Sequence, residues 1–314
     1  MMVSRLRKNF KSCISMINHQ MRLLILGLDG LDYNLVEKWR LSFFKQRYYG
    51  KHYIGFLKKL YTPIVWGCFL TGVNVEEHGY SLHQLVEKRG KDAFKSQILR
   101  RLYSIRKKVP IGNLRIRKIL IKLGLVNPYQ GSIMPESLLN KTFLKLLKDL
   151  NYKVATVEVP GYNEEVNEYF RSTYGLLLSA SLDEKRAYID KILEETDRRM
   201  IKTMDYIDKG YDLVFTYSPL PDIAFHLAVK PTLRIKVWLK NVHEHLQQIL
   251  RPLIKEAENR NYTILIVSDH GFDLNKYYHS NYGFWSLSIE PPGWWSIETI
   301  LDFKENIIKM ITSE

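Results

Sequence analysis

The sequence predicts an α/β protein with a doubly wound, mostly parallel central sheet flanked by helices and a small, basic helical insertion. Three apolar runs rich in β-branched residues predict buried strands, at Leu23 to Leu28, Leu213 to Tyr217 and Ile264 to Ser268. Long helical patterns lie between them, at Leu182 to Ile207 and Arg234 to Asn259. Strands that alternate with helices are typical of a parallel sheet covered on its faces by helices.

A weaker strand is predicted at Lys153 to Val159. Residues 82–150 differ from the rest of the chain, because they are basic, helical in pattern and interrupted by prolines and glycines. We therefore expect a single catalytic domain over residues 21–314, with an insertion or cap at about 82–150. Residues 1–20 are expected to be a disordered basic leader, or sequence that precedes a true start at Met21.

The composition indicates a globular protein without a membrane-spanning segment. The chain of 314 residues is 46% hydrophobic and 25% charged, and no window approaches the roughly 18 unbroken apolar residues of a membrane span. Cys13 and Cys68 allow at most one disulfide, so no disulfide framework supports the fold. We expect a reducing compartment and hence a cytoplasmic protein.

The formal net charge of +14 favours anionic partners. Much of it lies in residues 88–122, where Asp92 is the single acid. Apolar residues recur at helical spacing from Ile98 to Ile105, which favours a solvated helical face over this region. A nucleic acid or another phosphate-rich partner is the alternative that the charge leaves open.

An aspartate follows each of the three main predicted strands: Asp29, Asp222 and Asp269. Ligands of open α/β sheets collect beyond the carboxyl ends of the strands, so we expect these carboxylates to converge. Gly30 permits a tight turn directly after Asp29. A single aspartate in such a position is more often a turn residue or a helix cap, and only the combination indicates a site.

The segment Tyr61-Thr62-Pro63 predicts the start of a helix, with Thr62 at the N-cap and Pro63 at the first helical position. The positive end of that helix would surround the Thr62 hydroxyl and favour a phosphoryl group there. A capping threonine without any function is the alternative interpretation.

Histidines accompany two of the aspartates. His226 lies four residues after Asp222, which places both on one face if the segment is helical, and His270 directly follows Asp269. His279 lies ten residues beyond Asp269 and is the last candidate. Ionised oxygens mixed with neutral nitrogens favour Zn²⁺, Mn²⁺ or related ions over Ca²⁺.

These blocks, in this order, resemble the alkaline phosphatase superfamily, and within it the type I phosphodiesterase/nucleotide pyrophosphatase branch. The resemblance covers most of residues 21–290 and is carried by Leu28-Asp29-Gly30, Thr62-Pro63 with Trp66, the segment Thr71 to Gly79, Asp222 through His226, Ser268-Asp269-His270-Gly271, and His279 with Gly283. It implies that Thr62 is the nucleophile. The metal ligands it implies are Asp29, Thr62, Asp269 and His270 for one ion, and Asp222, His226 and His279 for the other. It also implies that Gly72, His78 and Gly79 pack the nucleophile helix.

The resemblance implies a hydrolase of phosphoric ester or anhydride bonds that uses two divalent ions, Zn or Mn being favoured, and a phospho-threonine intermediate. We expect a phosphodiesterase or nucleotide pyrophosphatase acting on a phosphate ester or nucleotide-like small molecule. A phosphomonoesterase or phosphonate hydrolase on the same site is one alternative, and a non-catalytic anion- or nucleic-acid-binding relative is another. Thr62 argues against a sulfatase, which would need Cys or Ser there. The oligomeric state stays open.

Overall fold

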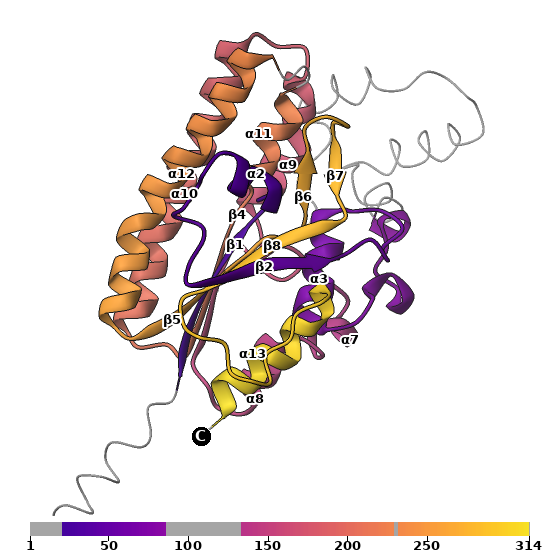
Figure 1. Cartoon of the computed structure of the whole chain (residues 1–314). Helices are drawn as coiled ribbons and strands as arrows, with labels where there is room; N and C mark the ends of the chain where they lie inside the picture. The colour runs from indigo at the N-terminus through magenta and orange to yellow at the C-terminus, as the bar shows by residue number, and fades with distance from the viewer. Residues whose placement is uncertain (1–20, 86–132, 229–231, 314) are drawn as a thin grey trace, which may run out of the picture.

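The computed structural model describes residues 21–85, 133–228 and 232–313 (Figure 1). Its strands are β1 (Arg22–Leu28), β2 (Tyr48–Tyr53), β3 (Val154–Val157), β4 (Leu213–Ser218), β5 (Tyr262–Val267), β6 (Gly271–Asp273), β7 (Tyr278–Ser280) and β8 (Tyr282–Leu287). Its helices are α2 (Tyr33–Lys38), α3 (Thr62–Thr71), α7 (Glu136–Leu139), α8 (Phe143–Asp149), α9 (Val166–Thr173), α10 (Leu182–Asp208), α11 (Asp222–Leu227), α12 (Leu233–Asn259) and α13 (Phe303–Thr312), with 3-10 turns η1 (Val75–His78), η2 (Tyr174–Leu177) and η3 (Ile300–Asp302).

The main sheet has six strands in the order β2-β8-β5-β1-β4-β3. Strand β1 lies at its centre and pairs in parallel with β4 and β5, while β3 extends the parallel part beyond β4. At the other edge, β8 pairs antiparallel with β5, and β2 pairs antiparallel with β8. A separate two-stranded ribbon, β6–β7, stands beyond the end of β5.

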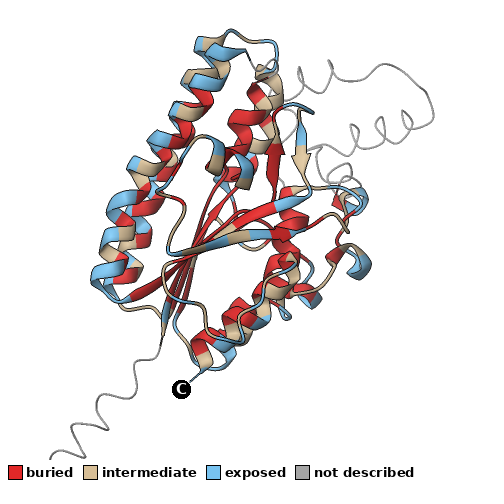
Figure 2. Cartoon of the chain, in the orientation of Figure 1, coloured by how far each residue is buried: buried red, intermediate tan, exposed pale blue. Residues whose placement is uncertain are grey.

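The sheet divides the core into two layers, because successive side chains of a strand point to opposite faces. Leu24 and Leu26 of β1 belong to the cluster beneath α10 and α12, whereas Leu23 and Ile25 belong to the cluster beneath α3, α8 and α13. Figure 2 shows the parallel strands of the sheet buried and the two long helices buried only along their inner stripes. This is the doubly wound arrangement that the sequence predicts.

The predicted elements and the structure agree closely in the parallel part of the sheet. The four predicted strands correspond to β1, β3, β4 and β5, and the two long helical patterns correspond to α10 and α12, with ends shifted by a residue or two. The antiparallel edge formed by β2 and β8 was not predicted. Among the described helices, none is long and apolar enough to cross a bilayer.

Parts of the predicted organisation fall outside the described residues, namely the leader at 1–20 and the basic stretch of residues 88–122. Residues 133–150, the last part of the expected insertion, are described and lie against the main core. Phe143, Leu144 and Leu147 of α8 are fully buried in the same cluster as α3 and α13. This segment is therefore part of the helical layer on that face of the sheet.

Candidate metal centre

The carboxyl ends of β1, β4 and β5 bring three aspartates to one edge of the sheet. Asp29 follows β1, Asp222 opens α11 just beyond β4, and Asp269 follows β5. The backbone N–H of Asp222 donates to the carbonyl of Asp29 at 2.9 Å. The N–H of Gly30 donates to Oδ1 of Asp269 at 3.3 Å. The structure thus brings together the carboxylates that the strand ends predict to converge.

Gly30 is needed for this close approach. Its φ of +73° lies in the left-handed region, and a Cβ at this position would lie 2.8 Å from the Cβ of Asp222. Any other residue would push α11 away from the end of β1. The turn after Asp29 therefore determines how closely Asp222 can approach Asp29.

Asp29, Asp269 and His270 form the first group of possible metal ligands, and all three are fully buried. Nε2 of His270 lies 3.3 Å from Oδ1 of Asp29 and 3.5 Å from Oδ2 of Asp269. The hydroxyl of Thr62 donates to Oδ2 of Asp29 at 3.1 Å. The structure therefore places the expected nucleophile in contact with this group.

The three residues expected to hold the second ion, Asp222, His226 and His279, also lie close together. The second group of possible metal ligands in the structure is Asp222, His270 and His279. Nε2 of His226 lies 3.2 Å from Oδ2 of Asp222, and Nε2 of His279 lies 3.4 Å from Oδ1 of the same carboxylate. The two histidine Nε2 atoms are 2.9 Å apart. The ring of His279 also stacks on His270 at a centroid distance of 4.0 Å, which joins the second group to the first.

Burial and crowding dominate the electrostatics of this centre. Burial, followed by the charge of Asp222, raises the pKa of Asp29 to about 7. Burial and then the charges of Asp29 and Asp222 raise the pKa of Asp269 well above its usual range. Burial alone would raise the pKa of Asp222 too, but His226 and His279 hold it well below its usual range. Three carboxylates so close together need compensating positive charge.

His270 offers a neutral nitrogen to this group of carboxylates. Burial lowers the pKa of His270 to about 3, so the ring is uncharged at neutral pH. Its Nδ1 lies 3.2 Å from the carbonyl oxygen of Gly271. A neutral imidazole whose other nitrogen is held by the backbone is the form in which histidine binds metals.

Several polar atoms that face the interior of this centre lack hydrogen-bond partners among the described residues. They are Oδ1 of Asp29, Oδ1 of Asp222, Oδ2 of Asp269 and Nε2 of His270, all of them buried. Orphaned buried polar atoms are rare and cost free energy unless something satisfies them. Ligands bonded at about 2.1 Å to a tetrahedral ion lie about 3.4 Å from one another, and the separations above are close to this value. The residues fit divalent metal ions.

Thr62 is the first residue of α3 and does not cap it. The N-cap is Tyr61, whose φ of −126° and ψ of 121° are extended, and Pro63 occupies the second helical position. The prediction of Thr62 at the N-cap and Pro63 at the first helical position is therefore wrong by one residue. The physical reason is that the carbonyl of Tyr61 already accepts the first helical hydrogen bond, from the N–H of Val65 at 3.1 Å. Thr62 still lies in the first turn, where the helix dipole favours negative charge.

The segment from Gly72 to Gly79, which was expected to pack against α3, does so only in part. Gly72 ends α3 in a left-handed conformation, and the following turn η1 packs Val75 into the core. His78 is exposed, so the expectation that it packs against the helix is wrong. Its turn is held by the buried Val75 and Tyr80 instead, because those are the apolar side chains of the segment.

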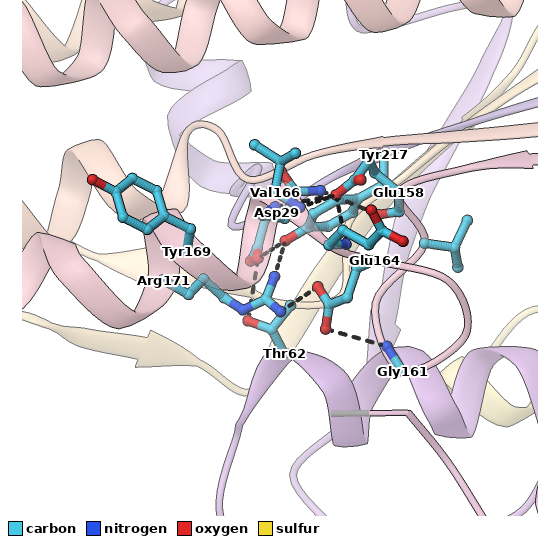
Figure 3. A network of polar contacts seen from close by, with 12 residues as sticks. Asp29, Thr62, Glu158, Gly161, Glu164, Val166, Tyr169, Arg171 and Tyr217 are labelled. Carbon is cyan, nitrogen blue, oxygen red and sulfur yellow. Dashed lines mark hydrogen bonds and ion pairs between the residues drawn. The ribbon is translucent and has the colours of Figure 1, made fainter. Parts of the chain in front are cut away.

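A polar network that the sequence analysis did not identify surrounds the Asp29 carboxylate (Figure 3). The hydroxyl of Tyr217, in β4, donates to Oδ2 of Asp29, and Nη1 of Arg171, in α9, lies 3.5 Å from that hydroxyl. Arg171 also forms a buried ion pair with Glu164. A tyrosine near the carboxyl end of a predicted strand was an available signal for Tyr217. No sequence signal distinguished Arg171, since it is one of 47 basic residues.

Comparison with known proteins adds a family to this geometry. The family model described as type I phosphodiesterase/nucleotide pyrophosphatase matches residues 23–299. No curated protein matches the sequence at a significant level.

Solved structures give matches of low sequence identity. Murine and human ectonucleotide pyrophosphatase/phosphodiesterase 5 are each 15% identical, with a TM-score of 0.37 over 80% of this chain. The chain spans 57% of the length of these two proteins. The 2-O GAG sulfatase BT1596 is 8% identical, with a TM-score of 0.51 over 93% of this chain and 71% of that one. This last likeness concerns the fold alone.

Proposed function

The chain belongs to the type I phosphodiesterase/nucleotide pyrophosphatase family of the alkaline phosphatase superfamily, and we propose that it is a two-metal phosphoesterase with Thr62 as its nucleophile. The observation that carries the proposal is the set of buried carboxylate oxygens and an imidazole nitrogen that lie beside the Thr62 hydroxyl without hydrogen-bond partners. A turn residue or helix cap needs no such set. The proposed bond cleaved is a phosphodiester or pyrophosphate bond of a nucleotide-like small molecule.

In this proposal Asp29, Thr62, Asp269 and His270 hold one ion, and Asp222, His226 and His279 hold the other. Zn²⁺ or Mn²⁺ suits this mixture of carboxylate, hydroxyl and imidazole ligands. When bound, the ions supply positive charge that favours the ionised form of the Thr62 hydroxyl and offsets the charge of the phosphoryl oxygens.

The residues of the chain then orient the reaction. The ionised Oγ1 of Thr62 forms a bond to phosphorus while the bond from phosphorus to the leaving oxygen breaks, and the leaving group departs with that electron pair. Asp29 holds Oγ1 at 3.1 Å and Tyr217 holds Asp29, so the nucleophile has a defined position before substrate arrives. A water molecule later cleaves the phospho-threonine and returns the hydroxyl.

The test compares hydrolysis of bis-p-nitrophenyl phosphate and p-nitrophenyl phosphate, with Zn²⁺ or Mn²⁺ added. Thr62→Ala should lower kcat for the diester by at least about a thousandfold, because it removes the nucleophile. Thr71→Ala, which removes a hydroxyl at the other end of α3, serves as the matched control and should retain activity. Preference for the monoester would move the protein to the phosphomonoesterase alternative. Metal-dependent turnover that survives in Thr62→Ala would contradict the assigned nucleophile.

A further inference from the structure

A buried ion pair lies beside the proposed nucleophile, on the segment that follows β3. The side chain of Glu164 is 0% exposed and that of Arg171 is 8% exposed. Nη2 of Arg171 contacts Oε2 of Glu164, and the backbone N–H of Gly161 donates to the other carboxylate oxygen at 3.4 Å. Glu164 is thus anchored at both oxygens and holds the guanidinium in one place.

The guanidinium of Arg171 has donors left over on the side away from Glu164. Nη1 lies 3.5 Å from the hydroxyl of Tyr217, and Nε is buried without a hydrogen-bond partner among the described residues. In Figure 3 the guanidinium lies between Glu164 and Tyr217 and points toward Asp29 and Thr62. The charge of Arg171 also lowers the pKa of Asp29, which agrees with this proximity. A buried N–H aimed at a candidate phosphoryl site needs an acceptor there.

We propose that Arg171 and Glu164 together set the charge of the phosphate group that the site prefers: Arg171 contacts a nonbridging oxygen, and Glu164 cancels the added charge of Arg171. The inference rests on the proposed function. Before Thr62 loses its proton, three ionised aspartates and two bound divalent ions would sum to one net positive charge, and the buried ion pair adds none. That balance matches a diester, which carries one negative charge, better than a monoester, which carries about two above its second pKa near 6.

A purely structural role for the pair predicts a different result. If Glu164 only fixed α9 to the loop at Gly161, its removal would lower the rates for monoester and diester by the same factor. If Glu164 balances charge, its removal leaves Arg171 uncompensated and shifts the preference toward the doubly charged substrate. The ratio of the two rates therefore separates the two roles, and the absolute rates do not.

The experiment uses the full chain with Zn²⁺ and compares kcat/KM for p-nitrophenyl phosphate and bis-p-nitrophenyl phosphate at about pH 8. Glu164→Gln should raise the monoester-to-diester ratio by roughly tenfold relative to wild type. Glu165→Gln is the matched control, because it removes the same charge from the next, exposed residue and should leave the ratio unchanged. An unchanged ratio in folded Glu164→Gln would overturn the inference.

Arg171→Gln gives a second test that does not depend on the folding of the first variant. It should lower the ratio by roughly tenfold, since the site then loses the cation that faces the phosphate. A rise in the ratio, or an equal loss for both substrates, would overturn the assignment of Arg171 to substrate.

Equilibrium binding separates failure of this inference from failure of the proposed function. Calorimetry with inorganic phosphate and with dimethyl phosphate measures the same charge preference without turnover. Glu164→Gln should strengthen phosphate binding relative to dimethyl phosphate by roughly tenfold. If wild type hydrolyses neither ester but Glu164→Gln shows this shift in binding, the charge role stands and the proposed catalysis fails. If wild type hydrolyses the diester and the shift is absent, the proposed function stands and this inference fails.

Discussion

The hydroxyl of Tyr217 donates to Oδ2 of Asp29, the same oxygen that receives the hydroxyl of the proposed nucleophile. The tyrosine is fully buried, and its ring packs edge-on against Trp66 of the nucleophile helix at a centroid distance of 5.6 Å. One side chain from β4 therefore orients both the carboxylate at the end of β1 and the helix that begins with Thr62.

Tyr217→Phe should keep this packing and remove the hydrogen bond. Because Asp29 then loses a partner that orients it, we expect metal affinity or kcat/KM to fall by about 10- to 100-fold. Metal titration and steady-state kinetics measure the two effects. Tyr206→Phe on α10 is the control. A variant with unchanged affinity and unchanged kinetics would show that the hydroxyl has no orienting role.

Asp269→Asn should abolish binding of one of the two proposed ions, and metal analysis of the purified protein measures this. An ion at about 100 times its dissociation constant stabilises the folded state by about 2.7 kcal/mol. Chelation should therefore lower the Tm of wild type, and it should lower the Tm of Asp269→Asn by less. Asp190→Asn, on an exposed part of α10, should respond to chelation as wild type does. Equal metal content in Asp269→Asn and wild type would remove Asp269 from the ligand set.

Phe69→Ala should destabilise the fold by about 3–5 kcal/mol, because it opens a cavity in the core. Phe69 lies on α3, is fully buried, and packs against Trp66, Phe143 and Phe303 at centroid distances of 5.2–5.6 Å. Urea unfolding measures the loss. Leu233→Ala, at a position 79% exposed, should change stability by less than about 0.5 kcal/mol. A loss below 1 kcal/mol at Phe69 would contradict the packing described here.

His243 should make stability depend on pH. Burial lowers the pKa of His243 to about 4 from an ordinary value of 6.5, and its Nδ1 lies 2.7 Å from the carbonyl oxygen of Leu239. The unfolded chain therefore binds more protons than the folded chain between these two values, so stability falls as the pH falls. This one group should cost about 2 kcal/mol between pH 7 and pH 5.

His243→Phe should remove that component, so the variant should lose less stability than wild type over the same pH interval. Urea unfolding at both pH values, with metals chelated, gives the comparison. His245→Phe, two residues along α12, is the control. An equal loss in His243→Phe and wild type would show that His243 is not the buried neutral group assumed.

The sequence determined the parallel part of this fold and where the main components of the candidate site lie. Strands β1, β4 and β5 were predictable because each is a short apolar run buried on both faces, and α10 and α12 because their apolar residues repeat at helical spacing. Placement of Asp29, Asp222 and Asp269 followed from one rule, that parallel strands end at the same edge of a sheet.

Only the tertiary structure decided the rest. Strand β2 has the sequence Tyr-Tyr-Gly-Lys-His-Tyr and forms by pairing with β8, some 230 residues away. No local sequence pattern therefore predicts it. His279 reaches His226 because the β6–β7 ribbon folds back across Phe272. Arg171 gains a role from Glu164 and Tyr217, which hold its guanidinium beside the end of β1. Local periodicity encodes which segments are buried, whereas long-range pairing encodes which side chains meet.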